Sequence, residues 1–321
     1  MRVLLWHVHG SWTTAFVQGG HDYLLPVNDA RDRDGLGRAA TWDWPATARE
    51  VPCAELADSD PDLVVLQRPH ELDLVRRWLR REPGRDLPAV YLEHNTPRGD
   101  PGEARHPMAD RSDIPVVQVT HFNDVFWDCG AAPTTVIEHG ICDPGHHYTG
   151  ELRRVAVAVN EPIRRGRITG TDLLPRFATE VGIDVFGMQV AGLPQALGLD
   201  DEQMKAYEDP PQLRLHHLMA ARRAYLHVHR WTSLGLSLIE AMQLGMPVVV
   251  LASTEAVEAV PAGAGVVSTR VGVLGGALRE LMHDRDLARE RGRQARTAAL
   301  ERYGLARFLD DWDRVLKEVA G

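Results

Sequence analysis

The segment from Trp231 to Ser253, WTSLGLSLIEAMQLGMPVVVLAS, holds residue types suited to binding a diphosphate. Small residues at 232–235 form a predicted turn, and a predicted helix follows over residues 237–244 and stops at Gly245. Free backbone N–H groups and the positive end of the helix dipole meet at such a helix start. The pattern therefore predicts an anion site there, and Glu240 is in reach of ribose hydroxyls.

The same residues allow a purely structural role. Ser237 and Glu240 have the spacing of a capping box, in which the glutamate satisfies only the N-terminus of its own helix. The spacing alone leaves the cap and the ligand contact equally open.

Arginines gather in a second segment, Asn160 to Phe177, which follows the predicted strand 155–159. Arg164, Arg165 and Arg167 lie close together there. A guanidinium pairs bidentately with phosphate oxygens and neutralises the charge that develops on a leaving diphosphate. A solvated basic loop is the alternative.

Histidines follow predicted strand ends through the first half of the chain. Parallel strands of α/β proteins bind ligands at their carboxyl ends, although any one of these histidines could be a satisfied polar group near the core. The candidates are His7, His9, His70, His94, His121 and His139.

We predict no metal site. Two pairs of histidines are spaced so that both members lie on one face of a strand, as metal ligands can: His7 with His9, and His227 with His229. No third ligand stands at a suitable spacing for either pair. The three Asp-x-Asp sequences, at 32–34, 58–60 and 284–286, lie in polar surroundings typical of solvated turns.

Two open α/β sheets are predicted to position these residues, because short apolar runs alternate with amphipathic segments in both halves. The boundary is predicted near Gly150, in the turn-rich stretch 143–154, and residues 28–60 are expected to form a loop or lid with only short structure. Residues 305–319 read as a final helix that crosses back onto the first domain. The predicted strands are 2–8, 63–66, 89–92, 116–119 and 135–137, then 155–159, 184–186, 225–228, 246–251 and 265–267; the other predicted helices are 72–81, 172–179, 213–223, 273–283 and 286–302.

Composition narrows the class of protein. The chain has 321 residues, 44% of them hydrophobic, which is enough for two cores. A formal net charge of −9 argues against nucleic acid as a partner. Three cysteines without metal-site spacing, no apparent signal sequence and no long apolar stretch lead us to expect a cytoplasmic protein with no integral membrane segment.

The segment around Glu240 resembles the donor-binding signature of the retaining family 4 (group 1) glycosyltransferases of the GT-B fold. Glu240-Ala241-Met242, Gly245 and Pro247-Val248 match its E-A-M-A-x-G-x-P-V sequence, and Thr232 stands where the family has a first glutamate. Arg164 matches the family arginine directed at the diphosphate, and Thr169 occupies the position of the family lysine.

The first half resembles the family more thinly. His94, in YLEHNTP, resembles the histidine near the donor sugar, and residues 134–143, TTVIEHGICD, resemble the segment that ends the first domain. The first loop, with Gly10 and Trp12, corresponds to one that lies against donor or acceptor in the family.

The resemblance implies two Rossmann-like parallel-sheet domains facing across a cleft, with residues 1–150 on the acceptor side and 151–304 binding the nucleotide sugar. It implies transfer of a sugar, with retention, from a nucleotide-diphosphate donor to a small-molecule or glycan acceptor, with no metal and no cofactor. Arg164, His94 and Glu240 would be catalytic. The donor site would be Arg164, Arg165, Thr169, Thr232, Ser233, Leu234, Gly235 and Glu240, and the acceptor side Gly10, Trp12 and His139.

Two other functions fit the same architecture. A UDP-sugar 2-epimerase would release free sugar without an acceptor. A non-catalytic nucleotide-sugar-binding protein is suggested by Thr232 and Thr169 at two donor-site positions.

Overall fold

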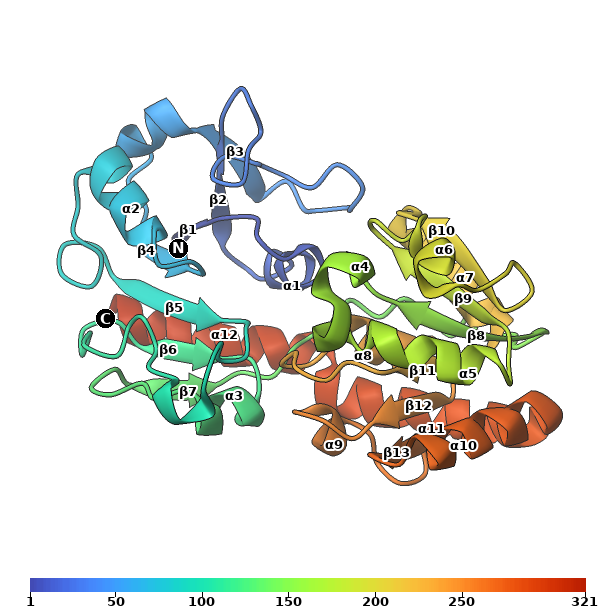
Figure 1. Ribbon diagram of the computed structural model, residues 1–321. Helices are drawn as coiled ribbons and strands as arrows, with labels where there is room; N and C mark the ends of the chain where they lie inside the picture. The colour runs from blue at the N-terminus through green and yellow to red at the C-terminus, as the bar shows by residue number, and fades with distance from the viewer. The chain divides into compact units, whose positions relative to one another are not determined.

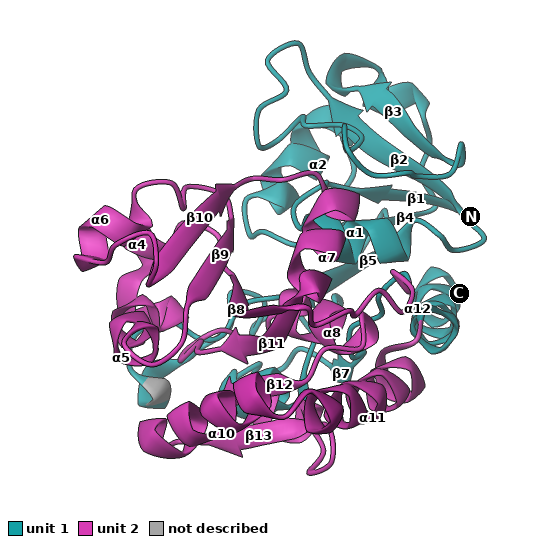
Figure 2. Ribbon diagram, turned by 90° about the vertical axis from the view of Figure 1, so that its right-hand side faces the viewer, with its two compact units in different colours: residues 1–142, 305–321 teal, residues 143–304 magenta. Residues whose placement is uncertain are grey.

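The computed structural model describes residues 1–100 and 102–321 and divides the chain into two compact units (Figure 2). Unit 1 consists of residues 1–142 and 305–321, and unit 2 of residues 143–304. Each unit is an α/β layer structure around a parallel sheet.

Unit 1 contains a seven-stranded sheet in the order β3-β2-β1-β4-β5-β6-β7, with every neighbouring pair parallel. The sheet is apolar because its central strands are buried on both faces. Its strands are β1 (Arg2–Leu5), β2 (Asp22–Val27), β3 (Ala48–Pro52), β4 (Leu63–Leu66), β5 (Ala89–Glu93), β6 (Val116–Gln118) and β7 (Thr134–Val136); its helices are α1 (Gly10–Phe16), α2 (Glu71–Leu79), α3 (His121–Phe126) and α12 (Leu305–Ala320).

Unit 2 contains a six-stranded parallel sheet in the order β10-β9-β8-β11-β12-β13 (Figure 1). Its strands are β8 (Leu152–Ala158), β9 (Ile183–Gly187), β10 (Met204–Glu208), β11 (Arg222–His227), β12 (Val248–Leu251) and β13 (Gly265–Ser268). Its helices are α4 (Pro162–Arg165), α5 (Leu174–Ala178), α6 (Leu193–Leu197), α7 (Gln212–Ala221), α8 (Leu236–Gln243), α9 (Ala256–Ala259), α10 (Val271–His283) and α11 (Arg285–Tyr303).

Every predicted strand is present, but three observed strands were not predicted. β2 contains Pro26, which disfavours a strand prediction, and the edge strands β3 and β10 carry charged residues. The predicted helix 213–223 ends early at Ala221, because Arg222 opens strand β11 instead. The predicted helix 172–179 is a 3-10 turn, Thr171–Leu173, followed by α5.

The segment before Gly150 packs on unit 2. The backbone N–H of Tyr148 donates to the Leu244 carbonyl at 3.1 Å, and that of Gly150 donates to the Ala220 carbonyl at 3.1 Å. The Tyr148 hydroxyl donates to the Arg223 carbonyl at 2.8 Å. Unit 2 therefore starts at Asp143, earlier than the boundary expected near Gly150.

Helix α12 completes unit 1 although it is the last element of the chain. Its apolar stripe, Phe308, Trp312 and Leu316, is buried. The Trp312 ring lies 5.6 Å from the Trp12 ring and 5.0 Å from the Phe16 ring, centroid to centroid. Aromatic burial of this size fixes helix α1, and with it the loop that follows strand β1.

A buried ion network fastens the start of the unit 2 sheet. The Asp184 carboxylate on β9 accepts from the Arg154 Nε at 2.6 Å and from the Arg222 Nε at 2.7 Å. The Arg222 guanidinium also lies over the Tyr207 ring, 5.0 Å from its centroid. Because the Arg222 side chain is only 4% exposed, its charge depends on Asp184 for compensation.

We expect Asp184→Asn to destabilise unit 2 by about 3 to 5 kcal/mol, because it leaves a buried guanidinium uncompensated. Urea unfolding followed by circular dichroism measures this change. Glu290→Gln, which removes an exposed partner of Arg293 on α11, serves as the control and should leave the transition in place. An unchanged transition in Asp184→Asn would contradict the role of the network.

Candidate functional site

Helix α8 begins at the carboxyl end of strand β11, and Gly235 is its N-cap residue. Ser237 therefore lies inside the helix, and its hydroxyl is 2.9 Å from the Tyr225 hydroxyl. The capping box with Ser237 at the N-cap is not formed. Glu240 is 5% exposed, and its Oε2 lies 3.8 Å from Nε2 of His216 on α7.

The turn before α8 packs tightly on strand β11. A Cβ at Gly235 would lie 2.5 Å from Cε1 of His227, so the backbone here approaches the imidazole as only glycine allows. Ser233 and Leu234 are buried, and the Thr232 hydroxyl lies 3.4 Å from Nδ1 of His229. The structure thus brings the predicted turn residues to the end of the sheet.

The arginine loop lies beside this turn. Gly170 has φ +73°, and a Cβ there would overlap the carbonyl oxygen of Val228 at the end of β11. The Arg230 backbone N–H donates to the Ile168 carbonyl at 2.9 Å. Two segments far apart in sequence, 160–170 and 228–235, are therefore joined at the carboxyl edge of unit 2.

The loop residues differ in what their side chains reach. Arg164 is exposed and paired with Glu161, whose Oε1 accepts from the Arg164 Nε at 2.8 Å. Arg165 is half-buried, and burial, followed by the charge of Arg164, lowers its pKa. Thr169 is buried, and its hydroxyl binds the Gly166 carbonyl at 3.1 Å, so this side chain secures the loop from within.

Three of the predicted histidines meet in unit 1. The His9 and His94 rings lie 4.1 Å apart, and the Trp12 ring meets His94 edge-on at 5.3 Å. Burial, with smaller effects from His9 and Arg307, lowers the pKa of His139 to about 3. Burial and the nearby His9 and His139 also hold the pKa of His94 well below its usual range.

This cluster keeps buried nitrogen atoms without partners. Within residues 1–100 and 102–321, neither Nδ1 of His139 nor Nε1 of Trp12 has a hydrogen-bond partner. Gly10 opens helix α1 beside it, against the Trp42 ring. The cluster offers neutral hydrogen-bonding groups on an aromatic surface, which suits a polar uncharged ligand.

Two of the remaining predicted histidines, His7 and His70, make structural contacts. Nδ1 of His7 lies 3.2 Å from the Gly37 carbonyl, and Nε2 of His70 lies 2.8 Å from the Asp34 carboxylate. His121 is exposed at the start of α3.

Gln67, which contacts His94, belongs to the cluster and was not predicted; nor was the separate buried pair of Glu93 and His106. Oε2 of Glu93 lies 3.1 Å from Nε2 of His106, and Oε1 of Glu93 accepts the Asn95 backbone N–H at 2.6 Å. Oε1 of Gln67 lies 3.1 Å from Nε2 of His94. Glu93 ends strand β5 and Gln67 follows β4, so their places at the carboxyl edge were the available signal.

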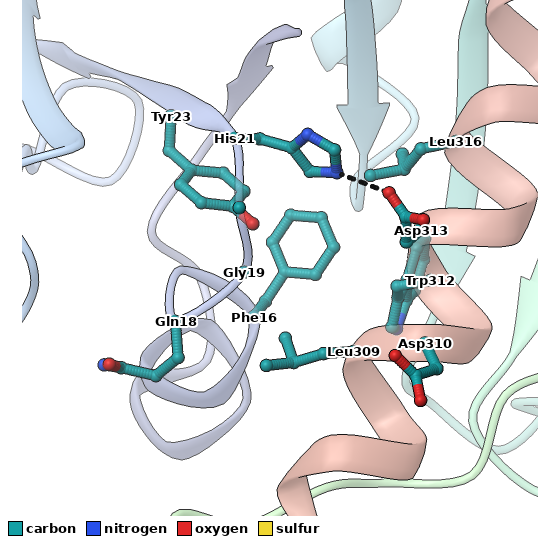
Figure 3. Close-up of a pocket in the computed structure, with 11 residues that line it drawn as sticks. Phe16, Gln18, Gly19, His21, Tyr23, Leu309, Asp310, Trp312, Asp313 and Leu316 are labelled. Carbon is teal, nitrogen blue, oxygen red and sulfur yellow. Dashed lines mark ion pairs between the residues drawn. The ribbon is translucent and has the colours of Figure 1, made fainter.

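A separate cavity of about 280 Å³ lies in unit 1 between the end of α1, the start of β2 and α12 (Figure 3). Aromatic rings of Phe16, Tyr23 and Trp312 line it, and Nε2 of His21 pairs with the Asp313 carboxylate at 3.4 Å. It contains none of the predicted site residues.

Residues 1–100 and 102–321 include no grouping of three or more His, Cys, Asp or Glu side chains suited to a metal ion. No helix in this part of the chain combines the length and apolarity needed to span a bilayer.

Residues 191–298 match the family model of glycosyl transferases group 1. The matched segment includes the turn 232–235 and Glu240. No curated protein matches the sequence.

Solved glycosyltransferase structures share the fold of the whole chain. The sucrose-phosphate synthase of Thermosynechococcus elongatus superposes with a TM-score of 0.73 at 14% identity, over 99% of this chain and 98% of that one. HepE of Anabaena, solved in complex with UDP-glucose, superposes with a TM-score of 0.73 at 16% identity, over 99% of this chain and 100% of HepE. WaaG, a glycosyltransferase involved in lipopolysaccharide biosynthesis, superposes with a TM-score of 0.66 at 13% identity, over 98% of this chain and 99% of WaaG. The chain has the GT-B fold of two Rossmann-like parallel-sheet domains, as predicted.

The buried imidazoles make folding sensitive to acid. The pKa of an unfolded histidine is about 6.5, whereas burial lowers the pKa of His139 to about 3 in the folded chain. The unfolded state therefore binds more protons between these values, and stability is full above about pH 6.5 and falls by about 1.4 kcal/mol per pH unit below it.

We expect His139→Asn to remove this part of the pH dependence. Tryptophan fluorescence during urea unfolding reports on unit 1, because every tryptophan except Trp231 lies there. His217 is exposed, so His217→Asn is the control; its free energy of unfolding should change with pH between 7 and 5 as in the wild type. If the free energy of unfolding depends on pH equally in the wild type and in His139→Asn, His139 is not held neutral by the fold.

Proposed function

We propose that this protein is a retaining glycosyltransferase that moves a sugar from a nucleotide-diphosphate donor to a small-molecule or glycan acceptor. The observation that carries the proposal is the start of helix α8. Backbone N–H groups follow Gly235 there, and a buried carboxylate, Glu240, stands on the same helix inside the segment that matches group 1 glycosyl transferases.

Unit 2 is the donor side in this proposal. The turn 232–235 and the N-terminus of α8 receive the diphosphate and sugar, and Glu240 binds the ribose hydroxyls. Arg164 and Arg165 lie on the adjoining loop and neutralise the departing diphosphate. Arg164 would exchange its exposed pair with Glu161 for the phosphate, a contact that costs little to break in water.

Unit 1 is the acceptor side. Gly10, Trp12 and His139 lie in the histidine cluster, where neutral imidazoles and an indole suit hydroxyl groups and sugar rings. His94, oriented by Gln67, is the group proposed to position the donor sugar.

The proposed reaction breaks the bond between the anomeric carbon and the β-phosphate oxygen and forms one between that carbon and the acceptor oxygen. The acceptor attacks the face that the diphosphate leaves, and its proton passes to the leaving phosphate oxygen. No side-chain base is therefore assigned. We propose that the arginines supply the positive charge that a metal would otherwise provide, and that no cofactor besides the donor takes part.

A cytoplasmic location and the absence of a nucleic-acid partner complete the proposal. The three cysteines are free thiols in the structure, as in a reducing compartment, and the net charge of −9 opposes polyanion binding.

Thermal shift and calorimetry with UDP-, GDP-, ADP- and TDP-sugars test the donor site, beginning with UDP-glucose because HepE binds it. We expect one class to bind, and Glu240→Gln to weaken that binding by about tenfold to a hundredfold through loss of a charged hydrogen bond. Glu301→Gln, an exposed carboxylate on α11, is the control and should bind as wild type does.

The outcomes separate the candidate functions. Binding without turnover in the presence of acceptors or water would favour a non-catalytic nucleotide-sugar-binding protein, and release of an epimerised free sugar would favour a UDP-sugar 2-epimerase. Absence of binding across the panel would contradict the proposed donor site.

A further inference from the structure

Two buried histidines lie at the end of strand β11, against the turn that precedes helix α8. His227 is 3% exposed and His229 is 8% exposed, and their ring centroids are 4.2 Å apart. A Cβ at Gly235 would lie 2.5 Å from Cε1 of His227 and 3.4 Å from Nδ1 of His229. Both imidazoles therefore underlie the N-cap of α8.

The pair is not explained by contacts within the chain. Nδ1 of His227 is buried and has no hydrogen-bond partner within residues 1–100 and 102–321. Nδ1 of His229 makes a long contact, 3.4 Å, to the Thr232 hydroxyl. The His227 ring therefore keeps hydrogen-bonding capacity that no described residue uses.

The surroundings keep both rings neutral while the site is empty of anions. Burial lowers the pKa of His227 to about 4, and burial, His227 and Arg165 hold the pKa of His229 well below its usual range. The groups that face the pair are Arg165 from the α4 loop, Tyr225 from β11 and the positive end of α8. Neither imidazole forms an ion pair with a carboxylate in the described part of the chain.

An anion bound at the N-terminus of α8 would favour protonation of these imidazoles. A diphosphate carries two negative charges, and at such short range their attraction favours the protonated form of an adjacent imidazole. A protonated imidazole also donates from both ring nitrogens, including Nε2 of His227, which would lie 3.2 Å from a Cβ at Gly235.

We propose that His227 and His229 form a proton-accepting subsite for the donor diphosphate, in which at least one imidazole takes up a proton from solvent when the nucleotide sugar binds. The inference rests on the proposed function and adds to it a source of positive charge on this side of the site. Thr169, whose hydroxyl is engaged inside the loop, brings no cation to the site, and the histidine pair supplies one only when the anion is present.

Calorimetry with UDP-glucose tests the subsite, because its diphosphate does not titrate between pH 5.5 and 8. Titrations in two buffers of different ionisation enthalpy report the number of protons taken up on binding. We expect close to one proton per bound UDP-glucose at pH 7. The affinity should rise by up to about tenfold per pH unit as the pH falls, for each proton linked to binding.

Variants identify the groups that titrate. His227→Asn and His229→Asn, singly and together, should reduce proton uptake and flatten the pH dependence, while His217→Asn on the exposed face of α7 should keep both. Imidazole NMR signals provide a second readout, since the two rings should be neutral at pH 7 in the free protein and at least one protonated when UDP-glucose saturates it.

Two failures are distinguishable. If UDP-glucose and the other nucleotide sugars do not bind the wild type, the proposed function fails and this inference fails with it. If a nucleotide sugar binds without proton uptake, or if uptake persists in the double variant, the inference is overturned and the proposed donor site stands.

Discussion

The close approach of two glycine turns to the end of strand β11 is the constraint on which the rest of unit 2 depends. Gly170 lies against the Val228 carbonyl, and Gly235 lies against the His227 ring. A side chain at Gly170 would overlap the Val228 carbonyl and push the arginine loop away from the sheet, and one at Gly235 would displace the His227 ring. Glycine at these positions lets the loop 160–170 and the turn 232–235 both lie against the end of strand β11, so the arginine loop is next to the start of helix α8.

In the proposed donor site, this arrangement needs few fixed cations. Arg164 and Arg165 stand on one turn, and Thr169, between them and Gly170, uses its hydroxyl to hold the turn together. On the other turn, buried imidazoles lie beside the helix start, and in our proposal they take a charge only when the donor diphosphate is bound. A site of this kind avoids the cost of keeping several buried positive charges together in the unliganded protein.

Much of the fold could be predicted from sequence, because buried parallel strands such as 63–66 and 246–251 are short apolar runs and α8 has clear limits. Strand β2 was missed because Pro26 argues against a strand, and the cluster of His9, His94 and His139 could not be foreseen because only the strand order brings it together. The alternation of His227 and His229 was visible in the sequence, but the burial of both rings against Gly235 follows from the fold and could not be predicted.

Hydrogen exchange, measured by mass spectrometry with and without a saturating nucleotide sugar, tests the central claim most directly, since it reports where in the chain the donor binds. The account predicts that amides of the turn 232–235, the first turn of α8 and the loop 160–170 become protected, because these backbone groups are the proposed diphosphate site. Protection confined to other segments, with these three unchanged in the presence of bound ligand, would contradict it.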